Sequence, residues 1–196
     1  MLAGGQQFNL SPTFNGRAFA LRVTQVAADS VVLADTGPGP VAGGERQNFL
    51  RDAAPVFGVI AHQLYSATLG GSGQDHSQAS AGDLSATLGS HHVTALWIES
   101  EATATAGFLN VPTSGKITVD GLMVDGQAVA ITGAPNQTIT FPDGFLVINE
   151  QSGSSSRHFG TLTVNALHLV VDGVGSMVAA SSTAELISSP TSNSIY

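Results

Sequence analysis

The chain has no cysteine among its 196 residues, so disulfide bonds, thiolate zinc sites and cysteine nucleophiles are excluded together. Charge is also scarce, because charged residues make up only 10% of the chain, against about 25% in an average soluble domain. Six Lys and Arg residues face fourteen Asp and Glu residues, a formal net charge of -8. These few cations cannot form a basic surface that binds a phosphate backbone, and we expect no nucleic-acid partner.

Long apolar runs are missing as well. None reaches the roughly 18 residues of a membrane span, and the opening "MLAGGQQFNL" lacks the basic and apolar parts of a signal peptide. The chain is therefore either cytosolic or a mature exported form with an added Met. Because Ser, Thr, Asn, Gln and Gly carry its solubility, we expect a secreted or cell-surface protein whose signal peptide has been removed.

Helical periodicity is nearly absent, whereas alternation with a period of two recurs along the chain. We predict an all-β, antiparallel sandwich of jelly-roll type with about nine or ten strands. It occupies residues 15–188 as one domain, between flexible tails at 1–14 and 189–196. Only Arg46–Ala54 offers a place for a short helix, and "GGSGQDHSQASAGD" is expected to be a flexible polar excursion.

The segment His92–Phe108 alternates most clearly and predicts an inner and an outer strand face. Its apolar residues are expected to point toward the core: Leu96, Ile98, Ala102, Ala104, Ala106 and Phe108. The outer face then carries Trp97, Glu99, Glu101, Thr103 and Thr105. Farther along, Asp125-Gly126 lies between two alternating arms and predicts a tight hairpin turn.

The second half of the chain contains "GLMVDGQAVAITGAPNQTITFPDGFLVINEQ", followed by "GTLTVNALHLVV" and "VAASSTAEL". With the alternation at Ala18–Val26, these segments resemble the choice-of-anchor P family of bacterial secreted or surface domains. The resemblance extends over nearly the whole chain and is weak between Thr36 and Ser90. Since the family has no established activity, what the resemblance implies is export from the cell.

Trp97, Glu99 and Glu101 form the candidate binding site. An indole ring offers a flat apolar surface for a sugar ring, and carboxylates accept hydrogen bonds from hydroxyl groups. The Cα atoms of Glu99 and Glu101 are about 7 Å apart along one strand, which suits a glycosidase pair only loosely because such acids usually approach a bond from opposite sides. The alternative is a solvated strand face with Trp97 packed under a loop.

Other polar clusters predict structural roles rather than chemistry. Alternation places His168 in an apolar row, as a buried imidazole hydrogen-bonded to a carbonyl or carboxylate. Glu150 and Arg157 are expected to form a cross-strand ion pair beside the flexible serines 154–156. Without a Gly-x-Ser-x-Gly turn, a hydrolase triad is not expected.

Metal sites and cofactors are not expected either. The imidazoles of His76, His91 and His92 lack the spacing of a zinc motif, and we assign them to loops. The Asp-Gly pairs fit ordinary turns, since no Asp-x-Asp-x-Asp ladder accompanies them.

The predicted function is a non-enzymatic secreted or cell-surface structural or adhesive protein, such as an envelope, matrix or filament component. Its partners would be other protein subunits, and the N-terminal residues Phe8, Leu10 and Phe14 are candidates for adding a strand to a neighbour's open sheet edge. The alternative is an extracellular glycan-binding module that uses the Trp97 face. A hydrolase is the least favoured class, for want of a coherent acid, base and nucleophile.

Overall fold

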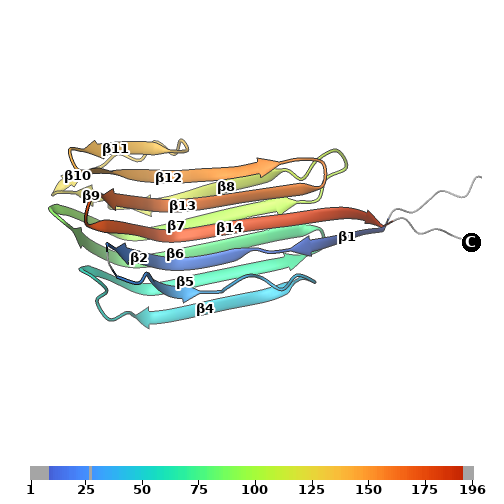
Figure 1. Ribbon diagram of the computed structural model, residues 1–196, viewed down its shortest axis with the longest axis horizontal. Coiled ribbons are helices and arrows are strands. Elements are labelled where there is room, and N and C mark those ends of the chain that lie inside the picture. The colour runs from blue at the N-terminus through green and yellow to red at the C-terminus, as the bar shows by residue number, and fades with distance from the viewer. Residues whose placement is uncertain (1–8, 27, 192–196) are drawn as a thin grey trace, which may run out of the picture.

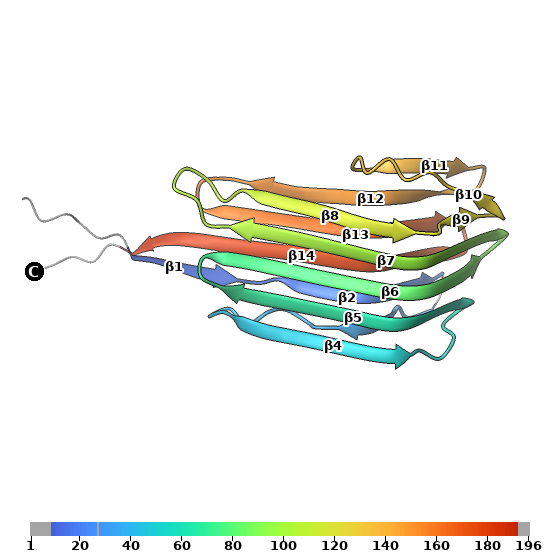
Figure 2. The same cartoon turned by 180° about the vertical axis from the view of Figure 1, so that it is seen from behind.

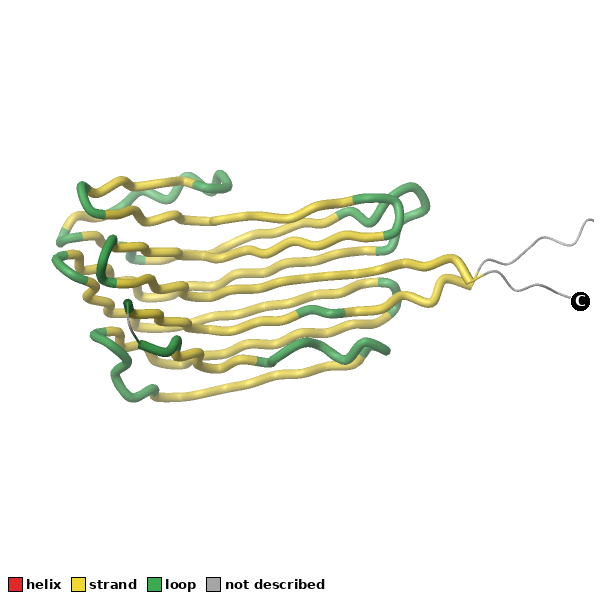
Figure 3. Tube along the Cα trace, viewed as in Figure 1, coloured by secondary structure: helices red, strands yellow, loops and turns green. Residues whose placement is uncertain are grey.

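The computed structural model describes residues 9–26 and 28–191, which form fourteen strands and no helix. Strands occupy most of the described chain, and the connections between them are mostly short (Figure 3). Among these residues no helix has the length and hydrophobicity to cross a membrane.

Two seven-stranded antiparallel sheets pack face to face (Figure 1). Sheet A has the order β11 (Gln137–Phe141), β12 (Gly144–Ser155), β13 (Phe159–Val171), β14 (Gly175–Thr191), β2 (Arg17–Gln25) and β3 (Val31–Asp35), and β1 (Asn9–Phe14) pairs with β14. Sheet B has the order β10 (Gln127–Ala128), β9 (Met123–Val124), β7 (His91–Thr105), β6 (Gln74–Leu88), β5 (Val59–Gly71) and β4 (Gly44–Asp52), and β8 (Thr113–Asp120) pairs with β7. The predicted all-β sandwich is confirmed, but it has fourteen strands where nine or ten were expected.

The sheets bury a large apolar core and a smaller one. The larger contains Leu21, Leu64, Ile98, Ile148, Leu167 and Met177, each at most 1% exposed. The smaller lies around Phe14, Ala104, Val164 and Leu186. Several buried inward side chains are small and polar, and one pair is hydrogen-bonded between the sheets: Ser100 Oγ lies 2.8 Å from Ser182 Oγ. Such pairing removes most of the penalty of burying a hydroxyl group.

A row of unpaired residues crosses sheet A from strand to strand. The paired positions on either side place Asn149, Ala166, Ala180, Ala20 and Ala34 opposite one another, although none of the five has a pairing partner itself. Asn149, Ala180 and Ala34 adopt positive φ angles of 57°, 53° and 48°. Because one unpaired residue faces another, the register is the same on both sides of the row, but the buried positions change from even-numbered to odd-numbered on β13.

A similar but stepped row crosses sheet B through Arg51, Gln63, Asp83 and Leu96. Arg51 lies opposite Gln63, and Asp83 lies opposite Leu96, whereas the register of β5 with β6 shifts between the two pairs. Gln63 and Asp83 again have positive φ angles, of 50° and 48°. On β7 the buried positions are odd-numbered before the row and even-numbered after it. We refer to these two lines of residues as the transverse rows.

Two segments expected to lack strand structure are strands. The proposed helix at Arg46–Ala54 is wrong, because Gly44–Asp52 forms β4 at the edge of sheet B. Nearly all of its residues are exposed, so no apolar alternation marks it in the sequence. The supposed polar excursion is the β5–β6 hairpin, closed by Ser72 and Gly73 with φ angles of 51° and 73°. Two consecutive positive φ angles are those of a type I′ turn.

The predictions of flexible tails are wrong for residues 9–14 at the N-terminal end and for residues 189–191 at the C-terminal end. Asn9–Phe14 forms β1, which pairs in register with residues 186–191 at the end of β14. Figures 1 and 2 show the two strands running side by side past their neighbours at one end of the sandwich. Residues 1–8 and 192–196 lie outside the described part of the chain.

The buried carboxylate of Asp75 lies at the junction of β1 and β2. Asp75 is 1% exposed, and its Oδ2 accepts a hydrogen bond from the Glu185 amide at 2.8 Å. Burial raises the pKa of Asp75 to about 6, although the amides of Glu185, Asn15 and Gly16 act in the opposite direction. Desolvation is therefore the larger effect.

Replacing Asp75 with asparagine should stabilise the protein at neutral pH. Since the folded pKa lies above the unfolded value, the stabilising contribution of Asp75 is complete below about pH 4 and is lost as the pH rises through about 6. The amide side chain keeps the acceptor for Glu185 without burying a charge. We expect Asp75→Asn to raise the free energy of unfolding at pH 7 by about 1–2 kcal/mol.

Urea denaturation at pH 7 and at pH 4.5 measures this effect, because the gain should shrink at the lower pH. The matched control is Asp83→Asn on the same strand, since Asp83 is exposed and its substitution should leave stability nearly unchanged. A destabilised Asp75→Asn variant would show that the hydrogen bonds of the carboxylate outweigh its desolvation.

Candidate functional site

Trp97, Glu99 and Glu101 lie on the outer face of sheet B, on β7. Their neighbours Ile98, Ser100 and Ala102 are completely buried, which directs the three candidate side chains outward. Figure 2 shows this sheet nearest the viewer, with β7 between β8 and β6. The three residues therefore share one face, as the alternation of the sequence predicts.

The indole ring of Trp97 lies against a glycine on the adjacent strand. Gly82 is paired with Trp97, and a Cβ built on Gly82 would lie 3.6 Å from Cε3 and 3.7 Å from Cζ3 of the indole. The ring therefore lies over Gly82, at a separation that a Cβ would meet in ordinary van der Waals contact. Trp97 is partly exposed, so the ring is both supported from below and accessible.

Glu99 connects the indole to a neighbouring amide side chain. Trp97 Nε1 donates to Glu99 Oε2 at 3.3 Å, and Gln78 Nε2 on β6 donates to Glu99 Oε1 at 2.6 Å. Both carboxylate oxygens therefore have a donor, and the orientation of the Glu99 side chain is fixed from two sides. Such pre-organisation lowers the entropy that a bound ligand must remove.

Glu101 is paired with the only lysine of the chain. Lys116 Nζ on β8 lies 2.9 Å from Glu101 Oε1, and this hydrogen bond raises the pKa of Lys116. A shallow hollow of about 140 Å³ lies beside the pair, lined by Glu101, Thr103, Ser114, Gly115 and Lys116. Carboxylate, hydroxyl and ammonium groups thus continue the polar surface away from Trp97.

The same face contains an apolar residue that alternation assigns to the core. Leu96 is 67% exposed, because the transverse row of sheet B passes through it and turns both Leu96 and Trp97 outward. The prediction that Leu96 and Phe108 point inward is wrong, since Phe108 is 95% exposed in the loop after β7. The outer face of sheet B is consequently more apolar near Trp97 than the sequence indicates.

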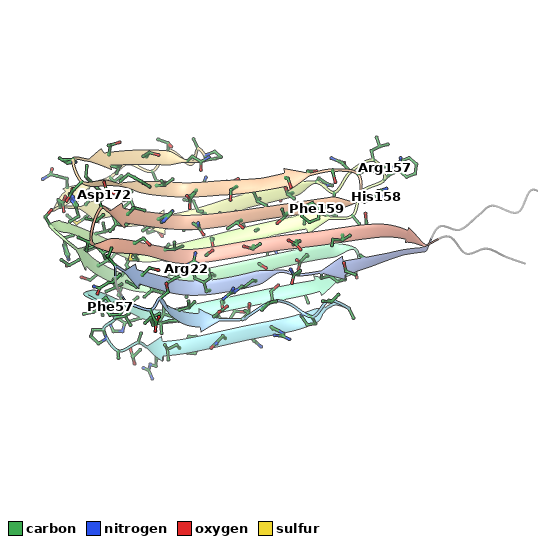
Figure 4. All side chains as sticks on the ribbon, viewed as in Figure 1. Arg22, Phe57, Arg157, His158, Phe159 and Asp172 are labelled. Atoms are coloured by element: carbon green, nitrogen blue, oxygen red, sulfur yellow. The ribbon has the colours of Figure 1, made fainter. Side chains whose placement is uncertain are left out.

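The cluster around Glu150 is on the opposite sheet and differs from the expectation. His168 Nδ1 lies 3.0 Å from Glu150 Oε2, and Asn165 Nδ2 donates to the same oxygen at 2.6 Å. His168 is partly exposed on the outer face of sheet A, because the alternation of β13 changes at Ala166. The carboxylate partner predicted for His168 is confirmed, whereas the predicted ion pair of Glu150 with Arg157 is wrong. Figure 4 shows Arg157 in the turn between β12 and β13, at the end of the molecule away from Asp172.

His91 is an organising residue that the sequence did not reveal. Its Nδ1 lies 2.8 Å from Asp125 Oδ2, and its Nε2 lies 2.8 Å from Asp143 Oδ1. The ring stacks on Phe141, with 4.0 Å between centroids. Asp143 lies in the β11–β12 turn of sheet A, whereas His91 and Asp125 belong to sheet B. We call this arrangement the His91 clamp.

Both carboxylates raise the pKa of His91, Asp143 most strongly. In turn, the pKa values of both aspartates are lowered, that of Asp125 chiefly by the His92 amide and that of Asp143 by His91. A loop position for His91 is therefore a wrong assignment, and His76 also lies in a strand, with Nδ1 3.0 Å from Thr103 Oγ1. Within residues 9–26 and 28–191, no group of three or more His, Asp or Glu side chains is arranged to hold a metal ion.

The residues proposed for strand donation have different positions. Phe8 lies outside the described residues, and Leu10 belongs to β1, which pairs with β14 of the same chain. Phe14 is 4% exposed and packs in the smaller core. Its aromatic ring is therefore engaged within its own molecule.

Prolines interrupt both outer edges of the β1–β14 ribbon. The Ser188 amide donates to His158 and so points away from β1. Because Ser188 is paired with Pro12, the Pro12 nitrogen in turn points away from β14, toward the other edge of the ribbon. The Pro190 nitrogen points the same way as the Ser188 amide, because the two residues are two positions apart on β14. A proline nitrogen has no hydrogen to donate, and prolines at such positions discourage the addition of a further strand.

Comparison with known proteins found no family model, no curated protein and no solved structure that matches this chain. The resemblance to the choice-of-anchor P family remains a prediction from the quoted motifs.

Proposed function

We propose that the protein is a non-enzymatic, secreted or cell-surface adhesive module that binds carbohydrate on the outer face of sheet B. The observation that carries the proposal is the Trp97 indole, supported by Gly82 and bordered by the fixed carboxylate of Glu99. A sugar ring has an apolar face that stacks on an aromatic ring and hydroxyl groups that donate to carboxylates.

The surrounding surface supports the same ligand class. Gln78, Thr103 and Lys116 provide amide, hydroxyl and ammonium groups on the side of Trp97 toward Glu101. Polar groups on a rigid strand face, with a partly buried aromatic residue among them, are typical of binding surfaces. Glu99 and Glu101 project from one strand face and each is hydrogen-bonded to a neighbour, which favours ligand positioning over acid–base catalysis.

Assembly through a donated strand has less support. The segment that would be donated is already β1, Phe14 is buried, and prolines interrupt the ribbon edges. An envelope or filament role would therefore require an exchange of β1 between copies rather than the addition of a free tail. We keep the glycan-binding module as the proposed function.

The Trp97→Ala variant tests the proposal directly. The unmodified protein should bind members of an array of neutral oligosaccharides, and the variant should bind the same ligands at least tenfold more weakly, about 1.4 kcal/mol. The Phe145→Ala variant is the matched control, because Phe145 is an exposed aromatic residue on β12 of the opposite sheet. Its binding should equal that of the unmodified protein.

Two results would contradict the proposal. One is the absence of binding to any array member by the unmodified protein, and the other is an unchanged affinity after Trp97→Ala. Circular dichroism of the variant should show unaltered β structure, because Trp97 projects from the outer face and not into either core.

A further inference from the structure

An apolar groove adjoins the proposed binding face. It has a volume of about 520 Å³ and is lined by Asp83, Leu84, Thr94, Ala95, Leu96, Gly121, Leu122, Met123 and Ala128. Leu96 and Met123, which are 67% and 41% exposed, bring two large apolar side chains together in one groove. The volume falls within the range of small-molecule binding sites.

The groove and the indole ring form one continuous surface. Leu96 precedes Trp97 on β7, and Asp83 follows Gly82, the residue beneath the indole, on β6. On the far side, Gly121 permits close contact with Leu96: a Cβ on Gly121 would lie 2.7 Å from Leu96 Cγ. A ligand stacked on Trp97 can therefore place a substituent directly in the groove.

The polar groups of the groove limit what that substituent can be. The exposed Asp83 accepts hydrogen bonds, and the Thr94 hydroxyl can donate one. Most of the remaining lining is aliphatic and favours a methyl group, since burial of a methyl group in apolar surroundings contributes about 0.8 kcal/mol. An acetamido group combines these features, because it has an N–H donor, a carbonyl acceptor and a terminal methyl.

The negative charge around the indole further limits which sugars can bind. Asp83, Glu99 and Asp120, which is paired with Trp97, surround the indole, and the whole chain has a formal net charge of -8. This field opposes uronic acids and sulfated sugars. A neutral amide N–H, in contrast, complements the Asp83 carboxylate.

We propose that the groove is the acetamido subsite of the glycan-binding face, so that the preferred ligands are neutral glycans containing N-acetylhexosamine. This inference rests on the proposed function, because it requires a sugar ring on Trp97. The groove then supplies selectivity, and the indole supplies the part of the affinity that all neutral sugars share.

Isothermal titration with three matched oligomers tests the subsite. They are β-1,4-linked oligomers of equal length, made of N-acetylglucosamine, of glucose and of glucosamine. We expect the acetylated oligomer to bind at least tenfold more tightly than the glucose oligomer, which lacks the methyl and the amide. Tighter or equal binding of the glucosamine oligomer would overturn the inference, because a free ammonium group would then be the recognised feature.

Two substitutions distinguish the contribution of the groove to binding from that of the Trp97 indole. Leu96→Ala removes a groove wall and should reduce the preference for the acetylated oligomer to about threefold or less, while binding of the glucose oligomer stays within twofold. Trp97→Ala should weaken binding of both oligomers by a similar factor. Because Leu96 is mostly exposed, its truncation should leave the melting temperature nearly unchanged.

The outcomes distinguish the two proposals. If the acetylated and glucose oligomers bind equally well, or if Leu96→Ala leaves their ratio unchanged, the subsite is wrong and the binding face stands. If none of the three oligomers binds although other members of the array do, the subsite is wrong and the binding face stands; if no array member binds, both are wrong.

Discussion

Replacing Phe14 with alanine will destabilise the protein by about 3 kcal/mol, the largest effect that we expect from a single truncation outside the larger core. Phe14 is 4% exposed and packs against Gly70 so closely that a Cβ on Gly70 would lie 2.6 Å from Phe14 Cγ. No neighbouring side chain can fill the space without moving, because β1, β14 and the β5–β6 hairpin surround it. The measurement is the free energy of unfolding from urea denaturation.

The loss of Phe14 should also loosen β1 from β14. Hydrogen exchange of the amides in residues 9–14 and 186–191 should accelerate more than exchange elsewhere, since this ribbon relies on Phe14 for its contact with the core. Phe108→Ala is the matched control, because Phe108 is 95% exposed and its truncation should change stability by less than about 0.5 kcal/mol. Equal effects of the two substitutions would show that β1 is not anchored by Phe14.

Truncation of His91 has the second-largest expected effect. His91→Ala removes two hydrogen bonds to carboxylates and the stacking contact with Phe141, and leaves Asp125 and Asp143 facing each other without a cation. We expect a loss of about 2 kcal/mol at pH 6, the usual size for deleting hydrogen bonds to charged groups. The adjacent His92→Ala is the control, because the His92 side chain is exposed.

The pH dependence of stability tests the ionic part of the His91 clamp. The folded pKa of His91 is raised, so its contribution is complete below the ordinary value of about 6.5 and is lost as the pH rises through the raised pKa. The pKa values of Asp125 and Asp143 are lowered, so their contribution is present above about 4 and is lost as the pH falls through the lowered values. The clamp should thus stabilise most between about pH 4 and 6.5.

Melting temperatures across pH 4–9 measure this window. The difference between the unmodified protein and His91→Ala should be largest between pH 4 and 6.5 and should narrow above it. A constant difference over the whole range would mean that His91 acts by packing against Phe141 alone, without an ionic contribution.

The sandwich was predictable because the long strands alternate clearly on each side of the transverse rows. Segments Arg17–Ala27 and Thr161–Val171 indicate strands without help from neighbours, and β2 and β13 are found there. The edge strand β4 was not predictable, since a strand exposed on both faces has no apolar alternation. The start of β6 was missed for the opposite reason: its inward residues Asp75 and Ser77 are polar although they are buried.

The candidate site shows the same limits at the level of single residues. Alternation correctly places Trp97, Glu99 and Glu101 on an outer face, because these residues lie on one side of the transverse row. It misplaces Leu96 and His168, since counting by two across an unpaired residue reverses inside and outside. The His91 clamp joins turns from both sheets, so no local sequence pattern predicts it. The contact of Trp97 with Gly82 likewise depends on the pairing of β6 with β7.

The transverse rows have a further consequence, for how the strands find their alignment. If one strand of sheet A shifted by a single residue, its unpaired residue would no longer lie opposite those of the neighbouring strands. Both halves of that strand would then present the wrong side chains to the interior. The line of unpaired residues therefore specifies the register of the strands across the sheet. Strands with a plain repeat of Ser, Thr, Ala and Gly would tolerate sliding, whereas this line makes every shifted alignment distinguishable from the native one.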